Sequence, residues 1–306
     1  MAEHISPAPM VLIIFNRPDL TSQVMNAIAN AKPEKLFVIA DGPRKDKIGE
    51  SEKCAAARKL TEDIRWPCEV FRNYSEENLG CRNRIASGLD WVFQRVDRAI
   101  ILEDDCLPDQ SFFDYCTTLL EHYETDTRIG CISGTNIDNT AQSTLASYYF
   151  SKYPLVWGWA TWRRVWENYD VDIPHWGEIR NSRWLEGIAE DNEREHWRKA
   201  FDRVFEESFD TWDYQLVFTL WQQRQLTIQP STNLISNVGF RPDATHTKEE
   251  HKLANMSRRA IEFPLVHPKD FNEDVGADSH YRAQNCKPRK RKNRLRRILH
   301  RLRNVR

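Results

Sequence analysis

The stretch Arg98-Ala99-Ile100-Ile101-Leu102-Glu103-Asp104-Asp105 decides the fold and indicates the site. Its apolar, partly β-branched part is typical of a buried parallel strand. The three acids follow at the end where open α/β sheets bind their ligands. Adjacent carboxylates repel one another and must be desolvated together, whereas a hard divalent cation bridging to a diphosphate would neutralise them. The stretch therefore predicts a cation and phosphate site, with a solvated acidic turn as the alternative.

Strand and helix patterns alternate on both sides of this stretch. The alternation predicts an α/β fold with a mostly parallel central sheet, flanked by helices and joined by right-handed crossovers. We find no GxGxxG and no GxxxxGK[ST], which argues against a Rossmann dinucleotide fold and a P-loop ATPase. The expected strands are 11–15, 36–40, 68–72 and 98–102, and the expected helices run from a cap at Asp19 or Thr21 to about Ala31, then over 51–64, 79–95 and 111–123.

Composition restricts the class of protein. A chain of 306 residues with 40% hydrophobic residues and 11 Trp is typical of a globular protein with one large core or two modest ones. Its seven Cys include no CxxC pair, which disfavours a disulfide framework and a zinc ribbon and suits a reducing cytosol. We see no signal peptide, and apolar runs such as Met10–Phe15 are far short of the ~20 residues that a spanning helix needs. We therefore expect a cytoplasmic protein.

Tryptophan dominates the middle of the chain. Seven Trp fall between Trp157 and Trp197, and most of them suit a core, for example Trp162 and Trp166 at i, i+4 on one helix. Trp157-Gly158-Trp159 instead reads as a loop, where aromatic faces suit the apolar faces of sugar rings.

Charge is unevenly distributed. Residues 287–306 hold eleven Lys or Arg and no acid, so the rest of the chain is acidic although the net charge is −1. A helical stripe of Leu and Ile within this tail predicts a cationic amphipathic helix that binds an anionic membrane surface, here the inner face of the membrane. The alternatives are a solvated tail and nucleic-acid binding. We expect no nucleic-acid partner because the acidic body would repel phosphates.

The order of motifs resembles the GT-A-fold, nucleotide-sugar-dependent glycosyltransferases. The similarity is greatest to the eukaryotic β-1,2-N-acetylglucosaminyltransferase I group and to bacterial glycosyltransferase-like proteins, and it covers Val11 to His246. It implies a nucleotide-sugar-binding half at 9–125 and an acceptor or catalytic half at 126–247 of one GT-A domain. An extended segment at 248–286 and the basic tail at 287–306 would follow. The motifs are Ile14-Phe15-Asn16-Arg17-Pro18, Asp41, residues 88–93 and 101–105, Pro108, residues 112–115, Trp157-Gly158-Trp159 and Trp212-Asp213.

The resemblance implies roles for residues of the donor half. In the similar enzymes the last acid of the triplet coordinates Mn²⁺, and the other two hold the ribose and order the metal's waters. These roles fall on Asp105, Asp104 and Glu103, with Mn²⁺ or Mg²⁺ as the cofactor.

Four further residues are expected around the nucleotide. Arg17 would bind the diphosphate or the nucleobase edge, or else form an ion pair near a turn. Asp41 stands where the similar enzymes contact uracil, or else is a turn residue before Gly42-Pro43. Asn78 opens the next helix, whose amides suit an anion or a nucleotide. Arg84 stands where the similar enzymes have a base-stacking histidine, and this departure leaves the base preference open.

Two acceptor-side residues complete the predicted chemistry. Asp213 is the candidate catalytic base, where the similar group has Trp-Asp-Asp-Trp and this chain has Trp212-Asp213-Tyr214-Gln215; its alternative role is a helix N-cap. His246 is a candidate metal or phosphate ligand, or else an exposed loop histidine. Trp157, Trp159 and Trp212 are expected in the sugar or acceptor pocket.

The resulting hypothesis is a metal-dependent hexosyl- or N-acetylhexosaminyltransferase. It would move a sugar from a nucleotide diphosphate donor, expected to be UDP-linked, to a glycan or lipid-linked acceptor, with inversion; a retaining mechanism stays open. The alternative from another class is a non-catalytic carbohydrate-binding or accessory protein on the same fold. A sugar-1-phosphate nucleotidyltransferase would need a Gly-rich loop after the first strand, and residues 14–18 contain no glycine.

Overall fold

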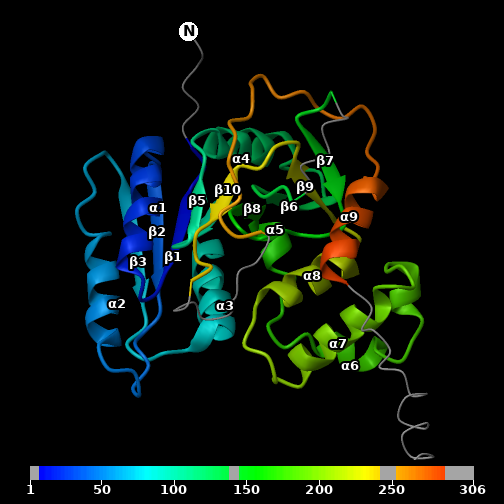
Figure 1. Ribbon diagram of the computed structural model, residues 1–306, viewed down its shortest axis with the longest axis horizontal. Coiled ribbons are helices and arrows are strands. Elements are labelled where there is room, and N and C mark those ends of the chain that lie inside the picture. The colour runs from blue at the N-terminus through cyan, green and yellow to red at the C-terminus, as the bar shows by residue number, and fades with distance from the viewer. Residues whose placement is uncertain (1–6, 138–144, 242–252, 287–306) are drawn as a thin grey trace, which may run out of the picture.

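A computed structural model describes residues 7–137, 145–241 and 253–286 of the chain. One sheet of eight strands forms its centre, in the order β3-β2-β1-β4-β8-β6-β9-β7. Helices flank this sheet (Figure 1), so the predicted α/β class with a central sheet is confirmed. Within the described part of the chain, no helix combines the length and the apolar composition needed to cross a membrane.

The N-terminal half of the sheet is parallel throughout. Its buried apolar strands pair from Met10↔Leu36 and from Met10↔Ile100, which leaves their carboxyl ends on one edge. The strands are β1 (Met10–Ile14), β2 (Lys35–Ala40), β3 (Glu69–Tyr74) and β4 (Arg98–Glu103), and the helices between them are α1 (Pro18–Ala31), α2 (Glu50–Lys59) and α3 (Gly80–Phe93). All of these lie within a few residues of their predicted positions.

Helix α1 begins differently from the prediction. It starts at Pro18, and its N-cap Arg17 makes no side-chain cap. The Thr21 hydroxyl, expected to cap the helix, donates to the Arg17 carbonyl from inside its first turn. Pro18 explains the early start, because its fixed φ and missing N–H suit the first helical position.

The C-terminal half of the sheet is mixed. Strand β8 (Trp159–Trp162) runs antiparallel between β4 and β6 (Ile129–Ser133), so the parallel order ends at β4. Helix α4 (Ser111–His122) contacts β4, β8 and β6. The sheet ends with β9 (Leu226–Pro230), which is parallel to β6, and β7 (Tyr148–Ser151), which is antiparallel to β9.

Short helices form a second aromatic core beside this half of the sheet. Trp176, Trp197 and Phe201 are fully buried there and lie in one hydrophobic cluster. The helices are α5 (Arg163–Trp166), α6 (Pro174–Ile179), the 3₁₀ helix η1 (Trp184–Gly187), α7 (Arg194–Phe205) and α8 (Asp213–Gln222). Trp162 and Trp166 are buried as predicted but do not share a helix, because Trp162 ends β8 and only Trp166 belongs to α5.

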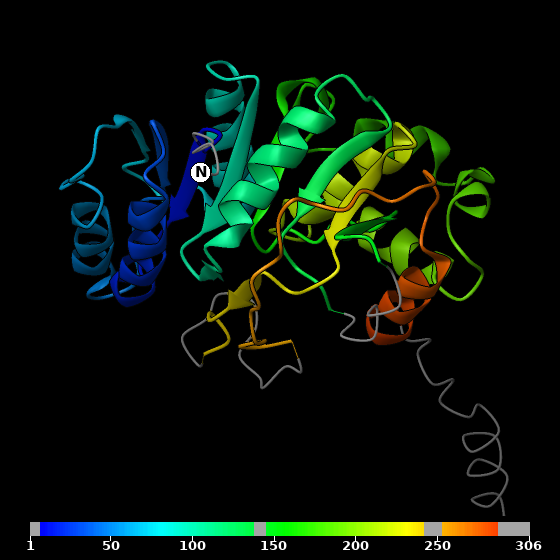
Figure 2. The same cartoon turned by 90° about the horizontal axis from the view of Figure 1, so that it is seen from above.

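The last described segment wraps the molecule. Strand β10 (Ile235–Asn237) pairs with β5 (Cys106–Pro108) just beyond the acidic run. Residues 253–274 then cross the sheet rim to helix α9 (Val275–Asn285), drawn orange in Figures 1 and 2. The expectation of an extended segment at 248–286 is wrong for α9, whose side chain Asp278 is buried against β7 through Ser151. The predicted helix at 287–306 lies outside the described residues.

Candidate active site

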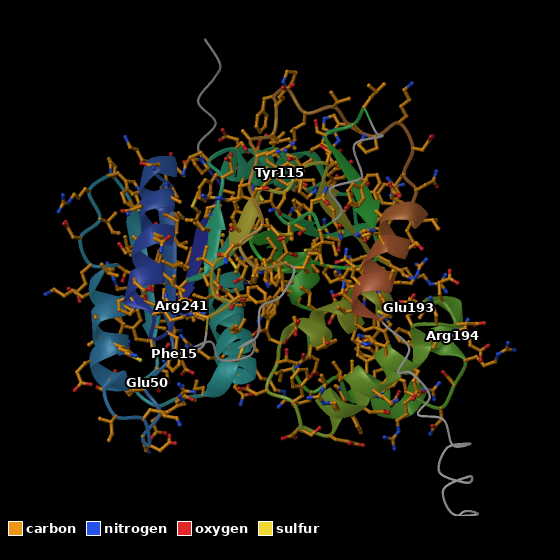
Figure 3. The ribbon with its side chains drawn as sticks, in the orientation of Figure 1. Phe15, Glu50, Tyr115, Glu193, Arg194 and Arg241 are labelled. Atoms are coloured by element: carbon orange, nitrogen blue, oxygen red, sulfur yellow. The ribbon has the colours of Figure 1, made fainter. Side chains whose placement is uncertain are left out.

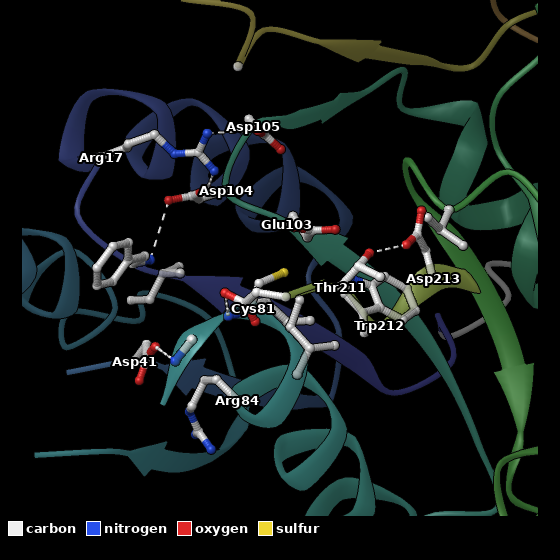
Figure 4. A pocket seen from close by; sticks show the side chains of 18 of the residues that line it. Arg17, Asp41, Cys81, Arg84, Glu103, Asp104, Asp105, Thr211, Trp212 and Asp213 are labelled. Atoms are coloured by element: carbon white, nitrogen blue, oxygen red, sulfur yellow. Dashed lines mark hydrogen bonds and ion pairs between the residues drawn. The ribbon is translucent and has the colours of Figure 1, made fainter. Parts of the chain in front are cut away.

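A pocket of about 600 Å³ opens at the carboxyl ends of β1, β2 and β4. Residues that follow parallel strands meet at this edge, so the pocket has the position predicted from the acidic run. Figure 4 shows the side chains that line it. Most of the predicted site residues are among them: Arg17, Asp41, Asn78, Arg84, Glu103, Asp104, Asp105, Trp157, Trp212 and Asp213. His246 lies outside the described residues.

The acidic run meets Arg17 at the start of α1. The Arg17 Nη1 atom lies 2.8 Å from Asp105 Oδ2, and Nη2 forms a second ion pair with Asp104. Burial raises the pKa of both Glu103 and Asp104 above their usual range, while Arg17 opposes the rise. Burial alone would lower the pKa of Arg17, but the two carboxylates outweigh it and keep the guanidinium charged.

The charge of the pocket suits a cation. Its lining holds six carboxylates (Asp41, Glu103, Asp104, Asp105, Asp210 and Asp213) and three guanidinium groups (Arg17, Arg44 and Arg84). Among the described residues, no three His, Cys, Asp or Glu side chains already converge as metal ligands. The oxygen donors of Glu103 and Asp105 are of the kind that Mn²⁺ and Mg²⁺ prefer.

Gly239 leaves room beside the acidic run. A Cβ atom at this position would lie 2.1 Å from Asp105 Oδ2, so any side chain would displace the carboxylate. The Val238 N–H donates to the Asp105 carbonyl and holds the two segments together. Donor chemistry, excess negative charge and this cradle fit a divalent cation bound with an anionic ligand.

Asp41 is occupied more fully than predicted. Its two carboxylate oxygens accept hydrogen bonds of 2.9 to 3.2 Å from four donors. These are the backbone N–H groups of Gly42, Leu79 and Gly80 and the side-chain amide of Asn78. Asp41 is therefore more than a turn residue, because it binds the first amides of α3. Burial raises the pKa of Asp41, against the effect of these backbone hydrogen bonds.

The backbone N–H groups that open α3 already have hydrogen-bond partners within the protein. Leu79 and Gly80 donate to Asp41, and Cys81 and Arg82 donate to Asp210. The first amides of α3, which the sequence suggested for an anion or a nucleotide, are therefore already bound by two carboxylates of the chain itself. Asp210 lies more than a hundred residues further along the chain, and no local pattern signals its contact with α3.

Arg84 lines the pocket and also links β2 to β3 through hydrogen bonds. Its side chain is buried and donates to the carbonyls of Ala40 and Asn73. With its guanidinium engaged in this way, it is not presented as a free surface for stacking a base. Arg44, which the sequence analysis missed, lies 5.5 Å from the Phe15 ring centre at the same end of the pocket. Its guanidinium pairs with Glu50, which also accepts from Asn16.

Asp213 is the first residue of α8 and faces the pocket from the opposite side. Its Oδ1 atom accepts the Thr211 hydroxyl (Figure 4). The same oxygen accepts the Tyr214 N–H at 3.0 Å. These two hydrogen bonds orient the carboxylate through Oδ1, so that Oδ2 is the oxygen that could meet a ligand. Asp213 lies close enough to Glu103 for its charge to contribute to the raised pKa of that residue. Asp213 is thus a helix-start residue and a pocket residue at once.

The Trp157-Gly158-Trp159 stretch divides between surface and core. Trp157 is half-buried, lines the pocket and meets Phe240 edge-on at 5.5 Å. Trp159 is fully buried in β8, where its ring stacks on Trp212 at 5.4 Å. The prediction that Trp159 contacts a sugar is wrong, because its strand turns the ring into the core. Trp212 lines the pocket although it is almost wholly buried.

The comparisons with known proteins are distant. No family model and no curated protein matches the sequence. A galactosyltransferase, LgtC, in complex with donor and acceptor sugar analogs aligns at a TM-score of 0.34 and 11% identity, over 69% of this chain and 70% of that chain. A UDP-glucose pyrophosphorylase complexed with UDP-glucose aligns at 0.36 and 8% identity, over 73% and 90%.

A third similar structure is 4-diphosphocytidyl-2C-methyl-D-erythritol synthase from Anaerococcus prevotii. It aligns at a TM-score of 0.37 and 7% identity, over 73% of this chain and 89% of that chain. None of these three structures is a β-1,2-N-acetylglucosaminyltransferase, so the resemblance to that group stays a prediction. The α/β class of this chain follows from its own strand order.

Proposed function

We propose that this protein is a glycosyltransferase that uses a nucleotide diphosphate sugar, UDP-linked by expectation, and Mn²⁺ or Mg²⁺. The observation that carries the proposal is the pairing of two acidic centres across one pocket. The acidic run lies at the carboxyl end of β4, and Asp213 faces it from the start of α8. A donor diphosphate and an acceptor hydroxyl would need such groups on opposite sides of the reacting carbon.

Asp213 would act as the base. Its Oδ1 atom is held by Thr211 and Tyr214, so Oδ2 would take the proton from the acceptor hydroxyl. As that O–H bond breaks, the oxygen would bond to the anomeric carbon, and the carbon–phosphate oxygen bond would break with its electrons leaving on the diphosphate. Attack opposite the leaving group inverts the anomeric centre, which makes inversion the expected outcome.

The acidic run and Arg17 would hold the diphosphate end of the donor. Asp105 would bind the cation, with His246 as a further candidate ligand. Asp104 would hold the ribose, and Glu103 would order the cation's waters. A bound cation would supply charge neutralisation for the leaving diphosphate. Arg17, now paired with Asp104 and Asp105, stands where it could turn to a phosphate oxygen. Asp41, Asn78 and Arg84 would shape the nucleoside end of the pocket, with Asp41 expected at the base.

The acceptor side would bind a glycan or a lipid-linked sugar. Trp157 lines this side of the pocket together with Trp212, and aromatic rings suit the apolar faces of sugars. The alternative function on the same fold is carbohydrate binding without turnover.

The decisive experiment is a screen of nucleotide sugars for hydrolysis with and without Mn²⁺, together with UDP binding by calorimetry. We expect metal-dependent hydrolysis of at least one donor, and Asp105→Ala should remove the metal dependence of UDP binding. Equal UDP affinity in the two proteins, with and without Mn²⁺, would reject the metal-site proposal. Binding of donors with no turnover in any of them would favour the non-catalytic alternative.

The basic tail is proposed to bring the protein to an anionic membrane surface, near lipid-linked acceptors. Removing residues 287–306 should release the protein from vesicles of phosphatidylglycerol and phosphatidylcholine while leaving donor hydrolysis intact. Vesicle binding that does not change on deletion would reject this role.

A further inference from the structure

The first turn of α3 is bound by two carboxylates that line the pocket and come from distant parts of the chain. Leu79 and Gly80 donate their N–H groups to Asp41, at the end of β2. The next two N–H groups, of Cys81 and Arg82, donate to Asp210 at 3.2 and 2.8 Å. The opening amides of a helix have no partners within the helix, and these two side chains satisfy them in succession.

Asp210 reaches α3 from the segment that carries the candidate base. It belongs to the loop between α7 and α8, three residues before Asp213. That short link is tightly bonded: the Thr211 N–H donates to the Phe209 carbonyl at 3.0 Å, and the Thr211 hydroxyl donates to Asp213. A shift of Asp210 would therefore move Asp213.

Gly80 is fitted to this contact. Its φ of +76° is a conformation that residues with a side chain rarely adopt. A Cβ atom there would lie 3.0 Å from Asp210 Oδ2. The close approach of Asp210 to the helix therefore depends on glycine at the start of α3.

We propose that Asp210 is a positioning residue that fixes Asp213 at its working distance from the donor. This inference rests on the proposed function. The first turn of α3 is already fixed to the donor side by Asp41, so the second carboxylate ties the base segment to the same turn. The spacing between donor and base is then set by α3 and not only by the link to α7.

A second tie to the same turn provides a matched control. The Arg82 side chain donates to Asp172 Oδ1 at 2.6 Å and to the Val171 carbonyl at 3.0 Å. Asp172 is an exposed acid, like Asp210, and contacts α3, but it does not belong to the link that carries Asp213. Asp172→Ala therefore removes a carboxylate from the first turn of α3 without freeing the base segment.

Steady-state hydrolysis of the best donor from the screen tests the effect on turnover. Asp210→Ala should lower kcat about 10- to 100-fold, because a misplacement of about 1 Å costs that much. The donor KM and the affinity for UDP with Mn²⁺ should stay within about twofold of wild type, since Asp41 still holds the donor side. Asp210→Asn keeps one acceptor oxygen and should recover part of the loss. Asp172→Ala should match wild type.

Hydrogen–deuterium exchange tests the contact independently of activity. Asp210→Ala should speed exchange in peptides that cover 80–83 and 209–216, and Asp172→Ala should leave the 209–216 peptide protected. Unchanged exchange in Asp210→Ala, or a kcat equal to that of Asp172→Ala, would overturn the inference. A wild-type protein that hydrolyses no nucleotide sugar would instead reject the proposed function, and with it a positioning role, whatever the exchange shows of the contact itself.

Discussion

The two halves of the sheet bury different kinds of side chain. In the N-terminal half, aliphatic residues of β1, β2 and β4 fill a parallel core, and polar groups appear where the strands end. Beside the C-terminal half, aromatic rings pack around Glu193, which is fully buried and paired with Lys152 at 2.8 Å. In the N-terminal half the polar groups of the site thus lie at the edge of the sheet. Beside the C-terminal half an ion pair lies inside the aromatic core. Mutations of similar type should have different consequences in the two.

The largest expected effect separates the two halves by function. Asp213→Asn should lower the kcat of donor hydrolysis about 10²- to 10⁴-fold, because the amide cannot accept the proton. UDP binding should not change, since the diphosphate contacts are proposed for the N-terminal half. Rates and calorimetric affinities measured together check this, with Asp105→Ala as the variant that loses binding instead. Full turnover in Asp213→Asn would show that the base lies elsewhere.

A large loss of stability is expected where the halves join, at β8. Trp159→Ala should lower the free energy of unfolding by about 3–5 kcal/mol, the usual cost of deleting a buried large aromatic side chain. Trp157→Ala, two residues away at the pocket wall, should cost less, because that ring is only half-buried. Chemical denaturation of both variants gives the difference. Equal losses would mean that Trp157 also belongs to the core.

The buried charge of the C-terminal half can be tested against a partly exposed pair of the N-terminal half. Glu193 accepts from Lys152, Tyr153 and Trp197. Glu193→Gln leaves Lys152 buried without an anion and should cost about 3–5 kcal/mol. Glu50→Gln should cost about 1 kcal/mol, because its partner Arg44 is more than a third exposed. Figure 3 shows the two acids on opposite sides of the molecule, and urea titrations of each variant would measure both losses.

A further test concerns pH. Burial raises the pKa of Asp278 to about 7, and its neighbour Glu273 adds to the rise. The unfolded carboxyl titrates near 4, so the folded state holds the extra proton between those values. Its contribution to stability therefore falls as pH rises from about 4 to 7 and then levels off. Asp278→Asn should flatten that part of the stability curve, measured by denaturation at several pH values. A slope that persists would assign the titration to another group.

The sequence predicted the N-terminal half well because its signals are local. Apolar runs marked β1, β2 and β4, and the ends of parallel strands must share one edge, which brought Arg17, Asp41 and Asp105 together before any contact was known. Helix limits differ by a few residues, as at Pro18, because caps depend on single side chains.

The C-terminal half was harder because its contacts join distant parts of the chain. Nothing near Trp159 signals that it enters an antiparallel strand between β4 and β6. The same holds for Asp210, which meets amides more than a hundred residues away, and for Asp278, which is buried under β7 by a bond to Ser151. Periodicity describes an element but does not identify the strand or helix that covers it.

The place of β8 has a consequence for synthesis of the protein. Strands β1 to β4 are complete once Glu103 has left the ribosome, but one side of β4 pairs with β8, which ends at Trp162. Until Trp162 has been synthesised, the nascent chain exposes the unpaired, apolar edge of β4. Such an edge can pair with strands of other chains and cause aggregation. Slowing translation between these two points should therefore increase the yield of insoluble protein.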